Sequence, residues 1–515
     1  MLALLSGSYH VGLVALARGL RELGWDIVAT QGARVAFASE GITARAIEDL
    51  TGSPMMLGGR VQTLHPTIHA GLLARRDSPE HRAELERNGI TPIDLVAVNL
   101  YPFDEAVTVG ATGSELLEKI DIGGAALLRA AAKNHPGVVV LARPDRYSAV
   151  LEELRERGSV APETRRELAA EAFAHTAAYD AMIAARLSAE AGVLFPEDLT
   201  LSLRKSRDLR YGENPHQLAA FYALRGEDGA MTSAEQLHGK AASFNNMLDI
   251  NAAWRIVADF GQPTVAIVKH QNPCGIASDT GIARAYERAF LCDSVSAFGG
   301  IVGSNRPVSR ELAQAMKDTF YEAIIAPGYA EDALPLLRER KNLEILSAKN
   351  NGFGSRRSRR TDHGALDFKR VSGGMLVQTP DESVSDEANF KPVTERHPTL
   401  EELTDLIFAW RCVRHVTSNA IVLAKGLATV GVGPGQLSRV VAVEVAVRKA
   451  GENARLGVMA SDAYFPFPDG IEVAARAGVT AIIQPGGSLR DQMMIDTANR
   501  YRMAMLFTGR RHFKH

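Results

Sequence analysis

Short apolar runs alternate with amphipathic stretches along the first third of the chain. The apolar runs are typical of buried strands, and the stretches between them repeat apolar residues with helical spacing. Strands separated by helices predict a mainly parallel sheet, which binds ligands at the carboxyl ends of its strands. The expected strands cover residues 2–5, 26–30 and 138–142, and residues 94–103 are expected to form a strand that enters a loop. The expected helices cover residues 11–23, 34–40 and 124–133.

The pattern changes near residue 195, where we place a domain boundary. Residues 148–190 are rich in Ala, Glu and Arg and are predicted to be largely helical, whereas residues 192–217 show no helical period. Strand and helix then alternate again, and an irregular stretch at 347–365 divides this part in two. The sequence therefore predicts an α/β protein with domains at 1–195 and 196–515, and no internal repeat is evident.

Composition narrows the classes of partner. The 515 residues are 46% hydrophobic, with a net charge of −2. A general nucleic-acid binder usually carries a basic excess, so that class is disfavoured. No apolar stretch is long enough to cross a bilayer, and no signal peptide fits before the first strand. Cys274, Cys292 and Cys412 form neither a metal-binding pair nor a disulfide framework, so we expect no bound metal and reduced thiols in the cytoplasm.

The segment TVAIVKHQNPCG has the clearest chemical character. A buried-type strand at 264–268 leads into Lys269 and His270, and an Asn-Pro-Cys-Gly loop follows. Histidine can accept a proton near neutral pH and lysine can stabilise developing negative charge, so the two suit an acid/base pair. A solvated strand end is the alternative interpretation of this dipeptide. Cys274 is interpreted as a packed thiol, because no activating partner is visible.

Other loops carry weaker signals. Residues 431–439 (GVGPGQLSR) resemble a phosphate loop but lack the GxGxxG spacing and the GK[ST] ending, which disfavours a nicotinamide or ATP site. The arginines within 356–360 suit an anion site or, in the favoured interpretation, a solvated loop. The proline-broken YFPFPD segment predicts an exposed aromatic loop, although phenylalanines such as Phe465 and Phe467 more often belong to a core.

Several motifs occur in order along the chain. The C-terminal region contains RYGENPHQ (210–217), VKHQNPCG (268–275), SAFGGIV (296–302), SNAIVLAK (418–425), SDAYFPFPDG (461–470), IIQPGGS (482–488) and the terminal RHFKH. The N-terminal third contains GRVQTLHP, HAGLLARR, NLYPF, DIGG and LRAAAKNH. With these motifs the chain resembles the AICAR transformylase/IMP cyclohydrolase family from Leu2 to His515. The resemblance implies a methylglyoxal-synthase-like N-terminal domain and a zinc-free, cytidine-deaminase-like transformylase region in two similar subdomains.

The resemblance also implies roles for the transformylase motifs. His270 would remove a proton from the AICAR amine, and Lys269 would stabilise the oxyanion or assist proton transfer to the folate nitrogen. Asn419 would hold the formyl group, and Asp469 the pterin end of 10-formyltetrahydrofolate. The nucleotide site would be formed by Arg210, Tyr211, His216, Arg439, Phe465, Arg511 and Phe513.

The same resemblance implies partners and an assembly. AICAR and the folate would be the bound small molecules, and each transformylase site would lie at the interface of a homodimer. A monovalent cation is implied near Ser418, Asp462 and His515.

For the N-terminal domain, the resemblance implies a second reaction, the closure of FAICAR to IMP. Tyr101, Asp121 and Lys133 would be catalytic. The formyl oxygen would be polarised by Asn99 and the backbone around Gly123 and Gly124, and Arg60 and Thr63 remain to hold the substrate.

The phosphate-binding loops of this domain depart from the family pattern. SVSDKTG is replaced by SGSYHVG at 6–12, STGGT by ATQGA at 29–33, the lysine of GRVKTLHP by Gln62, and the end of DIGGPS by Ala125-Ala126. Hydrogen bonds to a charged group are worth roughly 1.5–3 kcal/mol each, so losing several weakens phosphate binding severely.

Two functions therefore stay open for the N-terminal domain: a working cyclohydrolase with a rearranged phosphate pocket, and a scaffold for the transformylase. We expect the scaffold, with formyl transfer as the main activity of the chain. A non-catalytic nucleotide-binding regulator is the alternative for the whole protein, and Lys269 and His270 argue against it.

Overall fold

The computed structural model describes residues 1–7, 10–225, 229–348, 366–381 and 389–515. Contacts divide the chain into two units. Unit 1 comprises Met1–Arg204 with Leu224 and Arg225, and unit 2 comprises Lys205–Ala223 and the described residues after 228. Among all these residues, no helix is long and apolar enough to span a membrane.

Unit 1 contains a sheet in which every neighbouring pair of strands is parallel, as the alternating pattern predicts. The strand order is β3-β2-β1-β4-β5. The strands are β1 (Leu2–Gly7), β2 (Asp26–Ala29), β3 (Arg45–Ala46), β4 (Leu95–Asn99) and β5 (Val139–Leu141). Because the strands are parallel, the ends of β1, β2 and β4 lie at one edge of the sheet.

The helices of unit 1 follow the expected amphipathic stretches, although α2 begins at Gln31 rather than at Arg34. The predicted helical region 148–190 is divided in two, because Gly158 ends α9 in the left-handed conformation (φ 69°) and Pro162 begins α10. The helices are α1 (Leu13–Glu22), α2 (Gln31–Ser39), α3 (Ile47–Thr51), α4 (Pro66–Leu73), α5 (Pro79–Arg87), α6 (Phe103–Thr108), α7 (Gly113–Leu117), α8 (Ile122–Lys133), α9 (Tyr147–Arg157) and α10 (Pro162–Glu190), with short 3₁₀ helices at Leu57–Gly59 and Pro144–Arg146.

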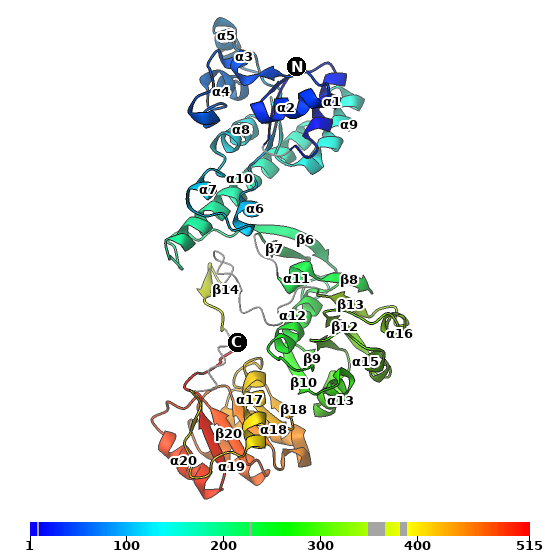
Figure 1. The fold of residues 1–515 in the computed structure, drawn as a ribbon, viewed down its shortest axis with the longest axis vertical. Helices are drawn as coiled ribbons and strands as arrows, with labels where there is room; N and C mark the ends of the chain where they lie inside the picture. The colour runs from blue at the N-terminus through cyan, green and yellow to red at the C-terminus, as the bar shows by residue number, and fades with distance from the viewer. Residues whose placement is uncertain (8–9, 226–228, 349–365, 382–388) are drawn as a thin grey trace. The chain divides into compact units, whose positions relative to one another are not determined.

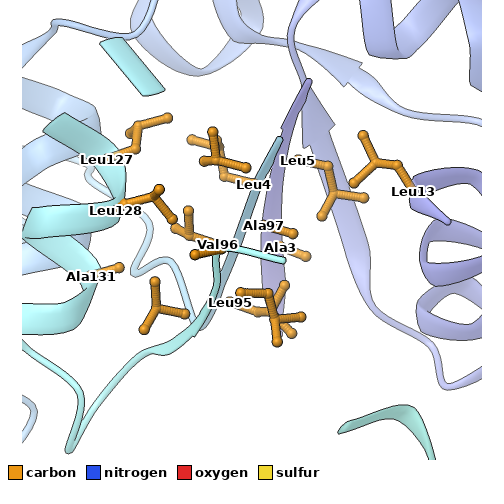
Figure 2. Close-up of a cluster of buried hydrophobic side chains, with 14 of the residues drawn as sticks. Ala3, Leu4, Leu5, Leu13, Leu95, Val96, Ala97, Leu127, Leu128 and Ala131 are labelled. Atoms are coloured by element: carbon orange, nitrogen blue, oxygen red, sulfur yellow. The ribbon is translucent and has the colours of Figure 1, made fainter. Parts of the chain in front are cut away.

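The core of unit 1 lies on both faces of this sheet. Successive side chains of a strand point to opposite faces, so Leu4 and Leu5 pack in different directions. Figure 2 shows Leu4 directed toward Leu127 of α8 and Leu5 directed toward Leu13 of α1. All four side chains are completely buried. The buried stretches of β1, β2, β4 and β5 are therefore nearly continuous apolar runs, as expected where helices cover both faces of a parallel sheet.

Unit 2 is built around one long sheet with the strand order β16-β21-β20-β19-β17-β18-β10-β9-β11-β12-β13-β8 over the described residues. Figure 1 shows its green strands at one end and its red strands at the other. The strands are β8 (Glu235–His238), β9 (Thr264–Lys269), β10 (Asn272–Ser278), β11 (Gly300–Ser304), β12 (Tyr321–Ala326), β13 (Glu344–Ser347), β16 (Lys391–Pro392), β17 (Ile421–Lys425), β18 (Ala428–Gly433), β19 (Val458–Ser461), β20 (Ala481–Gln484) and β21 (Ala504–Phe507).

Helices and two hairpins complete the described part of unit 2. One hairpin joins β6 (Leu203–Leu209) to β7 (Ala219–Leu224), and the other joins β14 (Asp367–Val371) to β15 (Gly374–Gln378). The helices are α11 (Ala230–Ser233), α12 (Phe244–Ala258), α13 (Ile282–Cys292), α14 (Ser294–Ala297), α15 (Arg310–Ala315), α16 (Ala333–Arg338), α17 (Leu400–Val413), α18 (Arg439–Ala450), α19 (Asp469–Arg476) and α20 (Asp491–Arg500).

The long sheet consists of two structural repeats, which corrects the expectation that the chain contains no internal repeat. The order β10-β9-β11-β12-β13 in one half matches β18-β17-β19-β20-β21 in the other, and β10 pairs antiparallel with β18 between them. Helices α12 and α17 share one core, whereas the opposite faces carry separate cores. The resemblance implied two similar subdomains, and the topology agrees.

A buried glutamate on β13 gives unit 2 a pH-dependent stability. Glu344 is 1% exposed. Its Oε1 accepts a hydrogen bond of 2.8 Å from Asn246 Nδ2, and its Oε2 has no partner among the described atoms. Burial raises the pKa of Glu344 from 4.5 to about 7. The folded state thus binds this proton more tightly than the unfolded chain, so stability from this group is full below pH 4.5 and is lost as the pH rises through 7.

Replacing Glu344 by glutamine should remove this loss, because the amide stays neutral and still accepts from Asn246. We compare the free energies of unfolding of Glu344→Gln and wild type by urea denaturation at pH 5 and at pH 8. The difference in favour of the variant should be larger at pH 8 than at pH 5 by roughly 2–3 kcal/mol. Glu339→Gln is the control, since Glu339 is exposed at the end of α16 in the same repeat. A stability difference for Glu344→Gln that is the same at both pH values would contradict the argument.

Candidate active sites

The β9–β10 connection presents the predicted acid/base pair. Lys269 ends β9, and its Nζ donates to Phe298 O of the SAFGG loop at 2.8 Å. His270 and Gln271 form the turn itself, which we call the 270 turn, with left-handed φ angles of 53° and 62°. Asp249 on α12 accepts from both turn N–H groups, at 3.0 Å from His270 N and 2.6 Å from Gln271 N. The His270 side chain is exposed, as a proton acceptor for a substrate requires.

Asn272 and Lys514 link the 270 turn to the second repeat. Asn272 Oδ1 accepts from Thr417 N at 2.9 Å. Lys514 Nζ donates to Gln271 O at 3.0 Å and to His415 O at 2.7 Å. The segment that leads to Asn419 therefore lies beside the turn that carries His270. Asp249, Asn272 and Lys514 received no role from the sequence.

Asn419 is held by its neighbours at both ends of its amide group. Its Nδ2 donates to Gln436 O at 2.8 Å, and its Oδ1 accepts from Arg439 Nη2 at 2.8 Å. Arg439 is 6% exposed and forms a 2.5 Å ion pair with Asp462, which is fully buried. The structure thus places Arg439 behind Asn419, where its guanidinium group is occupied by protein partners.

The other predicted transformylase residues lie on exposed loops. Arg210 stacks over the Tyr211 ring at 4.8 Å from its centroid, and His216 is exposed on the same β6–β7 loop. Arg511 stacks over the Phe513 ring at 4.6 Å. Asp469 is exposed at the start of α19. The planar cations and aromatic rings of these loops suit a flat anionic ligand such as a nucleotide.

Phe465 requires a correction. Its ring is completely buried, and its N–H donates to Gln484 Oε1 at 3.2 Å. It therefore supports the loop from the core and, in this conformation, cannot line a nucleotide site with its ring. The exposed aromatic residues of YFPFPD are instead Tyr464 and Phe467, and Arg490 stacks over the Phe467 ring at 4.6 Å.

Cys274 is a packed thiol, as the sequence predicts. It is buried, and burial raises its pKa to about 12. A thiol with so high a pKa is almost entirely protonated at neutral pH and is a poor nucleophile.

In unit 1, predicted residues gather at the N-terminus of α8. Asp121 caps this helix, with Oδ1 accepting from Gly124 N at 2.7 Å, and burial raises the pKa of its carboxyl group. Tyr101 is half-exposed, and both burial and the Asp121 charge raise its pKa. The glycines are required sterically, because a Cβ on Gly123 would lie 2.4 Å from Thr63 Oγ1 and one on Gly124 would lie 2.4 Å from Asp121 Oδ2.

Two supporting tyrosines hold this corner of unit 1. Tyr147 donates to Asn99 Oδ1 at 2.7 Å, which fixes the amide at the end of β4. Tyr179 on α10 accepts from Asp121 N and donates to Lys119 O, both at 2.9 Å. The predicted helical extension therefore helps to place Asp121.

Lys133 is not brought to this corner within one chain. It is exposed at the C-terminal end of α8. At a rise of about 1.5 Å per residue, the length of the helix separates it from Asp121 by roughly 17 Å. Its catalytic role stays a prediction that one copy of unit 1 does not explain.

The divergent phosphate loops have other partners in the structure. Gln62 Nε2 donates to Glu48 Oε1 at 3.0 Å, and Arg60 pairs with Glu118 on the surface. His10 Nδ1 is buried with no partner among the described atoms, and Val11 is exposed. Ser8 and Tyr9 lie outside the described residues. Gln62 and Arg60 therefore both have protein partners in the described structure.

The fold of unit 1 places it in a known class of domain. A family model described as "MGS-like domain" matches residues 12–126, which agrees with the parallel sheet and its helices. A second model, described as "AICARFT/IMPCHase bienzyme", matches residues 131–449. The chain belongs to the AICARFT/IMPCHase bienzyme family, which confirms the resemblance based on its motifs.

Full-length relatives agree with this assignment. The chain is 49% identical over 515 residues to a protein of Anoxybacillus flavithermus, with 100% of this chain and 99% of the relative covered. It is 48% identical over 524 residues to one of Desulfitobacterium hafniense and 47% identical over 515 residues to one of Bacillus subtilis, with the same coverage. Each relative is named "Bifunctional purine biosynthesis protein PurH".

Proposed function

We propose that this protein transfers a formyl group from 10-formyltetrahydrofolate to the amine of AICAR in purine biosynthesis. Membership of the bienzyme family supports a folate-type formyl donor. The observation that carries the residue assignment is the position of His270, exposed on a turn that hydrogen bonds join to the Asn419 segment. We also propose that the protein works in the cytoplasm.

The proposed reaction needs a base, an oxyanion donor and a group that orients the formyl carbon. His270 accepts a proton from the AICAR amine as its nitrogen attacks the formyl carbon. Lys269 uses one N–H for Phe298 O and so retains donors for the developing oxyanion. Asn419, held by Gln436 and Arg439, orients the formyl group. The tetrahedral intermediate then breaks its bond to the folate nitrogen, which takes up a proton, and leaves FAICAR and tetrahydrofolate.

Replacing His270 by alanine should abolish turnover and spare AICAR binding. The variant loses the proton acceptor, and a positioned base contributes about 10²–10⁴-fold to a rate. The AICAR Kd, measured by calorimetry, should change less than about 3-fold, since the nucleotide contacts lie elsewhere. Turnover is followed by the release of tetrahydrofolate, and near wild-type turnover would remove His270 from the mechanism.

The second repeat supplies a matched control for the neighbouring lysine. Lys425 ends β17 as Lys269 ends β9, and its Nζ donates to Arg455 O at 2.9 Å. Lys269→Ala should lower kcat, whereas Lys425→Ala should leave it near wild type.

We further propose that unit 1 closes FAICAR to IMP slowly or not at all. The lost lysines and hydroxyls support this proposal, as do the protein partners of Gln62 and Arg60. IMP formation from supplied FAICAR should therefore fall well below about 1 per second. The relatives' name "bifunctional" states the competing outcome, and cyclisation at ordinary enzymatic rates would refute the scaffold role.

Restoring the lost charge tests the physical reason. Gln62→Lys together with His10→Lys should accelerate IMP formation. Because Glu48 contacts residue 62, it would neutralise the new lysine, so the same variant is also made with Glu48→Gln. The rate of IMP formation should increase more in the variant that also carries Glu48→Gln than in the variant that keeps Glu48.

Finally, we propose a homodimer. Fully exposed leucines accompany the site loops: Leu218 follows RYGENPHQ, Leu437 lies in GVGPGQLSR and Leu489 follows IIQPGGS, at 102%, 103% and 107% exposure. Burying such apolar side chains against a partner subunit would stabilise the assembly. Sedimentation at micromolar concentration should show twice the chain mass, and a catalytically active monomer would contradict the proposal.

A further inference from the structure

We propose that Asp249 and Lys514 are positioning residues that hold the 270 turn from opposite sides and thereby fix His270 relative to Asn419. This inference rests on the proposed role of His270 as the base. It assigns a positioning role to a carboxylate on α12 and to Lys514 of the terminal RHFKH motif, neither of which received a role from the sequence.

The backbone of the 270 turn needs external support. His270 and Gln271 both adopt left-handed φ angles, which are unfavourable for residues other than glycine. The two carboxylate oxygens of Asp249 each accept one turn N–H, at 3.0 and 2.6 Å. These hydrogen bonds are charge-assisted, and Asp249 is partly buried. The carboxylate therefore stabilises the conformation that exposes the histidine.

Lys514 binds a carbonyl group of the same turn, whereas Asp249 binds its N–H groups. Its Nζ donates to Gln271 O at 3.0 Å and to His415 O at 2.7 Å. Its backbone is bound to the residue before Asn419, because Lys514 N donates to Ser418 Oγ at 3.1 Å and Ser418 N donates to Lys514 O at 2.9 Å. One residue thus joins the turn that carries the base to the segment that carries the formyl-holding amide. Burial lowers the pKa of Lys514 to about 8, and the Asp249 charge opposes this shift.

The second repeat contains the same pairing of a helix carboxylate with two turn N–H groups, but its turn carries no histidine. Asp405 on α17 accepts from Gly426 N at 2.6 Å and from Leu427 N at 2.7 Å. Gly426 and Leu427, which we call the 426 turn, have left-handed φ angles of 60° and 62°. Glycine occupies the first position there, where the 270 turn has histidine. The 270 turn has therefore kept a conformation that histidine disfavours, which is expected if presenting the imidazole is its function.

The test compares Asp249→Asn with Asp405→Asn. An asparagine has one acceptor oxygen for two N–H groups, so each variant loses a hydrogen bond at its own turn. Both should lower stability by a similar amount. Only Asp249→Asn should lower kcat for formyl transfer, by about 10–100-fold, with the AICAR KM changed less than about 3-fold. Equal kcat losses in both variants, or none in either, would overturn the inference.

Lys514 is tested by Lys514→Met and Lys514→Arg. We expect Lys514→Met to lower kcat by about 10-fold with little change in the AICAR KM, and Lys514→Arg to recover most of that loss, because arginine can again donate to the carbonyl groups. A Lys514→Met enzyme with wild-type kcat, or a Lys514→Arg enzyme as impaired as Lys514→Met, would remove Lys514 from the inference.

His270→Ala separates this inference from the proposed function. If His270→Ala abolishes turnover but Asp249→Asn does not alter kcat, the base assignment stands and the positioning role fails. If His270→Ala retains turnover, the proposed function of His270 fails first. Should Asp249→Asn not fold, Asp249→Glu provides a second variant that keeps the charge but displaces the turn, with the same expected loss of kcat.

Discussion

The chemistry that we propose for unit 2 depends on a turn with left-handed φ angles, whose backbone N–H groups need hydrogen-bond acceptors. In each repeat, a carboxylate from the preceding helix accepts hydrogen bonds from two successive N–H groups of the turn. Asp249 does so at the 270 turn and Asp405 at the 426 turn. Without that acceptor, the turn would leave donors unpaired and a costly backbone conformation unsupported. The β9–β10 and β17–β18 hairpins pair at the centre of the long sheet, where β10 meets β18.

The two repeats have kept their backbone scaffold and changed its side chains. Asn305 after β11 accepts from Thr264 N at 2.7 Å and uses its amide to bind three carbonyl groups, which makes a neutral support. Asp462 after β19 accepts from Ala420 N at 3.1 Å but carries a charge, and that charge holds Arg439 behind Asn419. A buried charge is expensive unless it is paired. The pair is explained if it orients the amide, because a neutral support would suffice for folding alone.

Local patterns in the sequence could predict the strands, most of the helices and the Lys269-His270 strand end, because these depend on apolar period and turn composition. They could not show that Phe465 is buried or that Lys133 lies a helix length from Asp121, because both depend on packing and geometry. The internal repeat is visible in the sequence at one point: Asp249 and His270 are separated by 21 residues, and so are Asp405 and Gly426. Lys514 lies in the RHFKH motif, but its role could not be predicted, since its contacts reach back 243 residues along the chain to Gln271.

The proposed mechanism requires His270, supported on its turn, to face the amine that receives the formyl group, while Asn419 orients that group. The most direct measurement is a crystal structure of the protein with AICAR bound. The account predicts the AICAR amine nitrogen within hydrogen-bond reach of the His270 ring, at roughly 3 Å, with the nucleotide against the loop that carries Arg210 and Tyr211. The proposal would be contradicted if the amine contacted other groups and His270 pointed to solvent, with no water bridging the amine and the His270 ring.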